Sequence, residues 1–401
     1  ECHNRLEYEY LRYNHIGRAF CPACGFKAPE YDYAGENVNI EKMTIDVRDA
    51  GGVGHYKLLN ESVFNIYNVV SAVALLREMG YSHEQIEGFF GRLNIVGSRY
   101  DEEKIGSRTL YRLLAKEKNA DLVLATDPDA DRLGVYVKDS KSGEYIPLTG
   151  NMSGSLLCDY VLSQKQAAGK IPADGEVVKS IVTTNLVDAV AANYGCKLIE
   201  VLTGFKYIGQ QILKNEETGK GTYLFGMEES YGCLIGTYAR DKDAISAVAA
   251  LCEAAAYYKM KGMTLWDAMV AMYEKYGYYK DAVKSIELKG IEGLAKIQEI
   301  LETLRNNTPT EIGGYHVVSA RDYKLDTVKD MKTGEVHPTG LPASNVLYYD
   351  LNDGAWLCVR PSGTEPKIKF YYGIKGTSLE DADQKSAALG EEVLAMINKM
   401  L

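Results

Sequence analysis

Hydrophobic residues recur with two different periods along the first part of the chain. Residues 38–60 alternate apolar and polar positions as strands do, whereas residues 65–80 repeat apolar positions at helical spacing and end on a glycine. Ser82, with Gln85 three positions on, has the capping-box pattern that starts a second helix. The first hundred residues therefore predict a unit of strands followed by two helices.

Beyond about residue 108 the pattern changes to repeated α/β units. Segments with clustered apolar residues predict buried strands at 120–126 and 176–183, and helical spacing predicts helices at 186–194 and 244–261. From about residue 276 short strands prevail, and residues 379–401 predict a closing helix. The expected fold class is α/β, with repeated mixed α/β domains followed by a smaller α+β domain at the C-terminus.

Composition limits the class of protein that this sequence encodes. The 401 residues are 46% hydrophobic and 25% charged, as in globular domains, and no run approaches the ~18 uninterrupted apolar residues that span a bilayer. A net charge of −10 argues against a nucleic-acid-binding surface, which normally carries a basic stripe. Eight scattered cysteines, most of them in apolar stretches, indicate reduced thiols and a cytoplasmic protein.

The segment at 126–133, Thr-Asp-Pro-Asp-Ala-Asp-Arg-Leu, constrains the chemistry most tightly. Asp127, Asp129 and Asp131 alternate on a loop directly after an apolar run. Three carboxylates converge there only if a hard cation offsets their repulsion, and octahedral Mg²⁺ with sites left open for phosphate suits them. We therefore expect a magnesium site that presents the metal to a phosphate group.

Two other interpretations of these aspartates fit less well. A calcium-binding EF-hand that starts at Asp127 requires glycine where Arg132 stands and glutamate where Lys138 stands. The simpler alternative is that the aspartates cap a helix. Their strict alternation around Pro128 favours the metal site.

Two further loops combine glycine with groups that suit a sugar. Residues 203–206 permit close approach of the backbone to a charged ligand, through Thr203, Gly204 and Lys206. In residues 226–232, Glu228 and Ser230 offer the acidic and hydroxyl groups that vicinal sugar hydroxyls require. Each loop alone indicates little more than a turn.

A fourth loop, Arg360-Pro-Ser362-Gly363-Thr364, suits a phosphate dianion. It offers a guanidinium group, two hydroxyl groups and exposed backbone N–H groups around the glycine. We expect the phosphate group of a ligand there.

Taken in order, these loops resemble those of the α-D-phosphohexomutase family over residues from about 108 to 401. The metal loop, the sugar loop and the phosphate loop come in the family's order, from its second, third and fourth domains. The resemblance implies a small hexose phosphate as substrate, Mg²⁺ as cofactor and glucose 1,6-bisphosphate as activator. It also implies the end of a second domain at 108–145, a third domain at 146–275 and a fourth at 276–401.

The same resemblance assigns roles to single residues. The implied catalytic residues are Lys242, near the transferring phosphoryl group, and Arg132. The implied substrate-binding residues are Thr203, Gly204, Lys206, Glu228, Ser230, Arg360, Ser362, Gly363 and Thr364, and the implied metal ligands are Asp127, Asp129 and Asp131. Met227 departs from the family, which often has glycine or glutamate there.

One motif of the family has no counterpart in these 401 residues. The family transfers a phosphoryl group through a phosphoserine in a Ser-His-Asn-Pro-like loop, and the serines before the metal loop lack that context. We therefore expect a phosphoglucomutase-type isomerase whose turnover by this chain is close to background, because the nucleophile is missing.

The N-terminal segment contains the only CxxC motif of the chain, Cys21 and Cys24. This motif is half of a zinc ribbon, and Cys2 occupies the place of a cysteine from the other pair. His3 and His15 are the alternatives for a fourth ligand, whereas a thioredoxin-like motif would need a surrounding βαβ pattern. With an incomplete set of ligands, we expect weak Zn²⁺ binding and loose packing of this segment.

The first part of the chain, to about residue 106, resembles part of the Mur ligase-like subunit of lipid II isoglutaminyl synthase, which carries a four-cysteine zinc ribbon. The likeness lies in the cysteines and in the segments at 64–68 and 97–101. It implies a partial zinc ribbon at 1–35, a Mur ligase-like fragment at 36–107 and an adenine near Asn65. The chain contains no Gly-x₄-Gly-Lys-Ser/Thr loop for ATP.

Three functions follow from these patterns. The leading one is the phosphoglucomutase-type isomerase, with glucose and mannose both open as the sugar. The alternatives are an ATP-dependent amide ligase subunit in peptidoglycan modification and a non-catalytic sugar-phosphate-binding module. A junction near residues 105–112 joins the two parts, by gene fusion or by an artefact of assembly or cloning.

Overall fold

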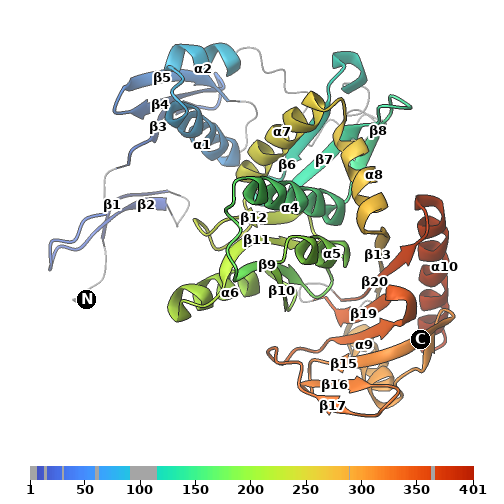
Figure 1. The fold of residues 1–401 in the computed structure, drawn as a ribbon. Helices are drawn as coiled ribbons and strands as arrows, with labels where there is room; N and C mark the ends of the chain where they lie inside the picture. Colours follow the sequence, from blue (N-terminus) through green and yellow to red (C-terminus); the bar gives the residue numbers. More distant parts are fainter. Residues whose placement is uncertain are drawn as a thin grey trace. The chain divides into compact units, whose positions relative to one another are not determined.

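The computed structural model describes residues 7–12, 16–28, 31–58, 63–90, 115–288, 290–362 and 366–401. The chain divides into two compact units, Glu1–Ile105 and Gly106–Leu401, whose elements are labelled in Figure 1. None of the helices in the described ranges combines the length and the apolar character that crossing a bilayer requires.

The described residues of the first unit form two antiparallel sheets and two helices. Its elements are β1 (Glu7–Arg12) paired with β2 (Ile16–Phe20), the sheet of β3 (Ala34–Asn39), β4 (Thr44–Asp49) and β5 (Gly52–Lys57), and the helices α1 (Val63–Glu78) and α2 (His83–Phe90). Alternation along β4 buries Ile45 and Val47 against Val73 of α1 and Ile86 of α2. The predicted order of strands followed by two helices is confirmed.

The predicted capping box at the start of α2 is also confirmed. The Ser82 hydroxyl accepts the backbone N–H of Gln85 at 3.2 Å, and the Gln85 side chain accepts the N–H of Ser82 at 2.8 Å. Both N–H groups would otherwise lack a partner in the first turn of the helix.

The first sheet among the described residues of the second unit is three-stranded and antiparallel. Its strands are β6 (Leu122–Thr126), β7 (Leu133–Lys138) and β8 (Tyr145–Leu148). Side chains of β7 alternate between buried and half-buried positions, with Leu133, Val135 and Val137 directed into the core. The turn between β6 and β7 contains the predicted metal loop.

A mixed sheet with the order β10-β9-β11-β12 follows. Its strands are β9 (Gly175–Ser180), β10 (Lys197–Val201), β11 (Thr222–Glu228) and β12 (Gly232–Ile235), and its helices are α4 (Gly150–Ala167), α5 (Leu186–Asn193), α6 (Phe205–Thr218), α7 (Ala244–Met260) and α8 (Leu265–Tyr276). Strands β10, β9 and β11 run parallel, and β12 runs antiparallel to β11. Helix α4 contacts strands of this sheet and of the preceding one (Figure 1).

Helices cover both faces of the mixed sheet, and β9 shows this directly. Every residue of β9 is buried. Val177 packs into the core formed with α4 and α5, whereas Val178 on the other face packs against Ile208 and Ile212 of α6. Adjacent apolar residues such as Val177 and Val178 are typical of a strand that is buried on both faces.

In the described residues, the C-terminal part forms an eight-stranded antiparallel sheet with two helices. Its path is β13-β20-β19-β18-β15-β16-β17, with β14 beside β15. The strands are β13 (Tyr278–Glu287), β14 (Glu311–Ile312), β15 (Tyr315–Asp322), β16 (Thr327–Asp330), β17 (Val336–His337), β18 (Leu347–Leu351), β19 (Trp356–Pro361) and β20 (Lys367–Gly376), and the helices are α9 (Gly290–Asn306) and α10 (Leu379–Asn398). The closing helix is confirmed, whereas the analysis of the sequence did not identify α9.

Replacing the helix cap tests the first unit. Ser82→Ala removes the hydroxyl group that accepts the Gln85 N–H in the first turn of α2, and we expect it to cost about 1 kcal/mol of local stability. Hydrogen exchange of the α2 amides in the full chain measures this cost. Ser71→Ala, at an exposed position in the middle of α1, is the control and should leave exchange nearly unchanged. Equal protection of α2 in wild type and Ser82→Ala would contradict a working capping box.

Candidate functional site

The three aspartates of the metal loop meet at the turn between β6 and β7. One carboxylate oxygen from each residue lies within 4.8 Å of the others. Asp127 Oδ1 accepts the backbone N–H groups of Asp131 at 3.1 Å and Arg132 at 3.0 Å, which closes the turn. Ala130 adopts the left-handed conformation, with φ of +54°, so that the chain reverses between Asp129 and Asp131. The structure thus brings the three sequence-predicted ligands together.

The charges of this loop are only partly compensated. Burial, together with the carboxylates of Asp131 and Asp129, raises the pKa of Asp127. Burial acts on Asp131 in the same direction, but the hydrogen bond and charge of Lys242 outweigh it and lower the pKa of Asp131. Asp131 Oδ1 is buried without a hydrogen-bond partner. A buried carboxylate oxygen without a donor is costly, so the set of oxygens fits Mg²⁺.

Lys242 lies where the metal loop, the sugar loop and residues 203–206 meet. Its side chain is 10% exposed, and its Nζ lies 2.9 Å from Asp131 Oδ2 and 2.8 Å from Asp241 Oδ1. The same Nζ stands 5.4 Å from the centre of the Phe205 ring, and a Cβ on Gly232 would lie 2.0 Å from Lys242 Cδ. Burial opposes the charge, but the hydrogen bonds to the two aspartates raise the pKa of Lys242. The ammonium group therefore stays charged and can attract a phosphoryl group.

Two other predicted cations are exposed. The Arg132 side chain is 56% exposed and its Nε lies 3.6 Å from Asp131 Oδ1 and 3.9 Å from Asp127 Oδ2. Lys206 is exposed at the start of α6, with its Nζ 4.9 Å from the centre of the Tyr207 ring. Both cations are therefore accessible to solvent, Arg132 beside the metal loop and Lys206 at the start of α6.

Glu228 and Thr203 provide polar groups from the ends of β11 and β10, the two strands on either side of β9. Glu228 is buried at the end of β11, and its Oε1 accepts the Gly204 N–H at 2.8 Å. Gly204 has a φ of +123°, which residues with a Cβ rarely adopt. Burial raises the pKa of Glu228. Thr203 Oγ1 is buried without a hydrogen-bond partner, and Ser230 is half-buried in the following turn.

Glu229 is a residue that the sequence patterns did not single out. Its Oε2 accepts the Ser180 hydroxyl at 3.2 Å. Burial, followed by the charge of Glu228, raises the pKa of Glu229, whereas the charge of Arg360 lowers it. The only signal in the sequence was its place between Glu228 and Ser230. Glu229 therefore lies in the same charged neighbourhood as the phosphate loop.

Backbone hydrogen bonds hold the metal loop against its neighbours. The Leu133 N–H donates to the Tyr231 carbonyl at 3.0 Å, which joins β7 to the sugar loop. The Ala244 N–H donates to the Ala130 carbonyl at 2.9 Å, which joins the start of α7 to the metal loop. Main-chain hydrogen bonds therefore fix the metal loop against the sugar loop and against the start of α7.

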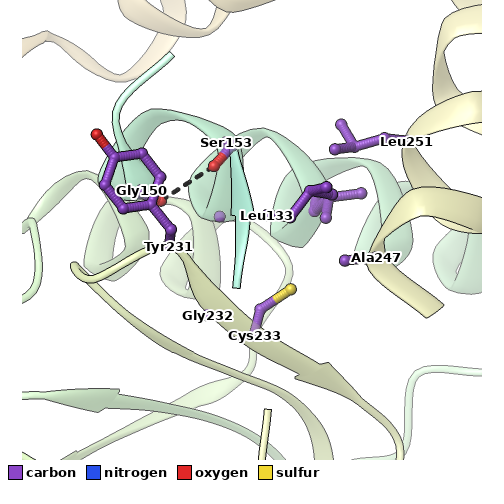
Figure 2. A pocket seen from close by; sticks show the side chains of 10 residues that line it. Leu133, Gly150, Ser153, Tyr231, Gly232, Cys233, Ala247 and Leu251 are labelled. Carbon is purple, nitrogen blue, oxygen red and sulfur yellow. Dashed lines mark hydrogen bonds between the residues drawn. The ribbon is translucent and has the colours of Figure 1, made fainter. Parts of the chain in front are cut away.

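The space beneath these loops is tightly filled. A cavity of about 10 Å³ remains beside the start of α4, between Gly150, Tyr231 and Leu133 (Figure 2). The Ser153 hydroxyl donates to the Gly150 carbonyl at 3.4 Å, and a Cβ on Gly150 would lie 2.2 Å from the Glu229 carbonyl oxygen. About one water fits a volume of this size. The close approach of Gly150 to the Glu229 backbone therefore helps to fix the sugar loop.

The predicted phosphate loop lies between β19 and β20. Arg360 and Ser362 are half-buried at the end of β19, and the Ser362 N–H donates to the Lys367 carbonyl at 2.7 Å. Gly363 and Thr364 lie outside the described residues. Their role in binding phosphate stays a prediction.

The predicted zinc and adenine sites fall largely outside the described residues. Cys21 is buried and Cys24 is exposed in the turn after β2, whereas Cys2, His3 and His15 are not among the residues described. Asn65 belongs to α1, but its side chain is not described. Within the described ranges, the aspartates of the metal loop are the one acidic, histidine or cysteine group close enough to hold a metal. Both predictions stay predictions.

Comparison with known proteins defines the class of two domains. Residues 149–276 match the family model for the phosphoglucomutase/phosphomannomutase α/β/α domain III, and residues 319–387 match the model for the C-terminal domain of the same proteins. These matches confirm the resemblance for the third and fourth domains, and they support the phosphohexomutase family.

Particular relatives are phosphoglucomutases. Those of Staphylococcus aureus strains bovine RF122 / ET3-1 and MRSA252 are each 36% identical over 277 residues, which is 69% of this chain and 49% of the relative. The chain thus spans about half the length of the curated relatives that it matches. The open form of parafusin, a phosphoglucomutase from Paramecium, covers 73% of this chain and 48% of its own, with 21% identity and a TM-score of 0.50. That likeness shows the fold.

Removing one aspartate tests the metal loop. We expect Asp129→Ala to weaken Mg²⁺ binding by more than about tenfold. Loss of a group that only orients a metal ligand already costs roughly that much, and Asp129 is itself a proposed ligand. Titration calorimetry on the full chain measures both affinities. Asp121→Ala is the matched control, because Asp121 is an exposed carboxylate at the opposite end of β6 that pairs with Lys259. Equal Mg²⁺ affinity in wild type and Asp129→Ala would exclude this site.

Proposed function

We propose that residues 106–401 bind a hexose phosphate as a phosphoglucomutase-type phosphohexomutase does. The reaction of this class interconverts hexose 1-phosphate and hexose 6-phosphate through a bisphosphorylated intermediate, with glucose 1,6-bisphosphate as activator. The relatives named phosphoglucomutase and the two matched domains support this class. We further propose that turnover by this chain is near background.

One observation carries the proposal. Asp131 Oδ1 and Thr203 Oγ1 are both buried without hydrogen-bond partners, and both lie on loops that converge with Lys242. Buried polar atoms are normally hydrogen-bonded, so unpaired oxygens on adjoining loops indicate that a ligand completes them. A cation satisfies the carboxylate, and a ligand hydroxyl group satisfies the threonine.

Each group then has a chemical role. Bound Mg²⁺ would be held by Asp127, Asp129 and Asp131, and would draw charge from a phosphoryl oxygen. Lys242 attracts the same phosphoryl group, and Arg132 at the rim adds a second positive charge. These groups orient the phosphoryl group without themselves accepting it.

The sugar and the second phosphate are held separately. The Glu228 carboxylate accepts hydrogen bonds from the sugar hydroxyl groups. The hydroxyl groups of Thr203 and Ser230 can donate to them or accept from them. Arg360 with Ser362 holds the phosphate that is not transferred, and Gly363 and Thr364 complete that loop by the family resemblance. Thr203 and Gly204 bring the backbone close to the ligand, and Lys206 lies at its edge.

Binding and turnover separate in this chain for a chemical reason. Phosphoryl transfer through a bisphosphorylated intermediate needs a nucleophile in line with the phosphoryl group. The 401 residues contain no Ser-His-Asn-Pro-like loop.

We also propose that the protein is cytoplasmic. The thiols of Cys158, Cys196, Cys233 and Cys358 are buried and form no disulfide, which fits a reducing compartment.

Binding tests the proposal first. We expect the chain to bind glucose 1-phosphate in the presence of Mg²⁺, and Arg360→Ala to weaken that binding about tenfold or more, because a charge-assisted phosphate contact is lost. Titration calorimetry measures both affinities. Lys329→Ala, which removes an exposed cation from β16 of the same sheet, should bind as wild type does. An unchanged affinity in Arg360→Ala would remove the sugar-phosphate site.

Turnover is tested on the same preparation. With Mg²⁺ and glucose 1,6-bisphosphate, a coupled assay should show conversion of glucose 1-phosphate close to the rate without protein. Loss of a nucleophile commonly costs several orders of magnitude in rate. Turnover of roughly 1 to 100 per second, as kinases reach, would show that this chain does contain a nucleophile.

A further inference from the structure

A separate hydrophobic core joins the mixed sheet to the C-terminal sheet within the second unit. It is formed by Ile181, Val182 and Leu202 from loops of the mixed sheet and by residues of the C-terminal sheet that include Tyr348 and Trp356. The loop that begins at Leu202 continues directly into Thr203 and Gly204, and β19 leads from Trp356 to Arg360. The two halves of the proposed binding site are thus fixed to opposite sides of one seam.

Arg321 bridges this seam at its polar edge. Its Nη1 donates to Glu200 Oε2 of β10 at 2.9 Å. On the other side, its Nε and Nη2 donate to both carboxylate oxygens of Asp350 at 2.9 Å and 2.8 Å. Ser319 also donates to Asp350, which fixes that carboxylate further. A planar guanidinium group with all three nitrogens engaged holds its partners at set angles, which a lysine cannot do.

The bridge is anchored at both ends. Lys179, which is fully buried in β9, lies 3.6 Å from Glu200 Oε1 and 2.5 Å from Asp188. At the other end, the guanidinium carbon of Arg321 stands 4.6 Å from the centre of the Tyr348 ring. Tyr348 in turn stacks on Trp356, with ring centres 5.4 Å apart and planes 5° apart. The contacts run from the mixed sheet to the first residue of β19.

These contacts act on the strands that lead into the proposed site. Glu200 lies on β10 three positions before Thr203, and Trp356 lies on β19 four positions before Arg360. The sugar loop is fixed to the mixed sheet, because Glu228 accepts the N–H of Gly204. Any shift of the C-terminal sheet against β10 therefore changes the distance between the sugar hydroxyl groups and the phosphate loop.

We infer that Arg321 is a positioning residue, which sets the spacing between the sugar loop and the phosphate loop and so favours ligands that span both. This inference rests on the proposed function, because it takes the sugar hydroxyls and the phosphate to contact different sides of the seam. A hexose monophosphate gains from the fixed spacing. Inorganic phosphate has no sugar hydroxyl groups, so it cannot contact both loops at once and gains nothing from their spacing.

Conservative substitutions separate this role from simple folding. Arg321→Lys keeps the charge but loses the fork, and a cavity of about 270 Å³ beside the bridge gives the new side chain room. Glu200→Gln removes the charge on the other side and leaves the Arg321–Asp350 pair intact. Arg305→Lys is the matched control, because Arg305 makes a similar fork to Asp322 and Asn345 entirely inside the C-terminal part.

The experiment is a titration of each full-length variant with glucose 1-phosphate and, separately, with inorganic phosphate, both with Mg²⁺ present. We expect Arg321→Lys and Glu200→Gln each to weaken glucose 1-phosphate about tenfold. Phosphate affinity should stay within about twofold, and the double variant should be little worse than either single variant, because both remove one coupling. Arg305→Lys should bind both ligands as wild type does.

The outcomes are distinguishable. Equal weakening of phosphate and glucose 1-phosphate, additive effects in the double variant, or the same loss in Arg305→Lys would overturn the positioning role. A wild type that binds no glucose 1-phosphate would contradict the proposed function instead. In that case calorimetric unfolding still tests the bridge: the second unit should unfold in fewer separate transitions in wild type than in the double variant. Identical unfolding profiles would then overturn it.

Discussion

The repulsion among three carboxylates on one hairpin turn is the constraint on which the site depends. Two backbone N–H groups and Lys242 offset part of that charge, and one buried oxygen of Asp131 stays without a donor. The turn keeps this arrangement because the start of α7 and the sugar loop bind it through backbone hydrogen bonds. Loops that are distant in the sequence therefore converge where a cation and an anionic ligand can complete the charge balance.

The seam between the last two domains sets a second condition, which concerns distance and not charge. Apolar side chains on both sides bury each other, but apolar contact is not directional and tolerates sliding. The forked bridge of Arg321 adds direction, because its hydrogen bonds to Glu200 and Asp350 are strong only at particular angles. A site made of two halves needs both kinds of contact.

Structural features that depend on neighbouring residues could be predicted from the sequence, whereas contacts between distant residues could not. The alternating aspartates and the Ser82 cap depend on neighbours within five residues, so their spacing alone indicated the turn and the helix start. Helix α9 was missed although Ile297, Ile300, Leu301 and Leu304 recur at helical spacing, because the short strands around it dominated the interpretation. Arg321 offers no local signal, since its partners lie 121 and 29 residues away.

The departure at Met227 shows how the strand period divides one motif between packing and chemistry. Side chains of β11 alternate between its faces, so Met227 and Glu228 cannot point the same way. Met227 is fully buried against α4, where a Cβ on Gly154 would lie 2.4 Å from its Cε. Glu228 faces the loops and binds Gly204. Met227 therefore belongs to the core, and its departure from the family leaves the polar groups that a sugar can contact unchanged.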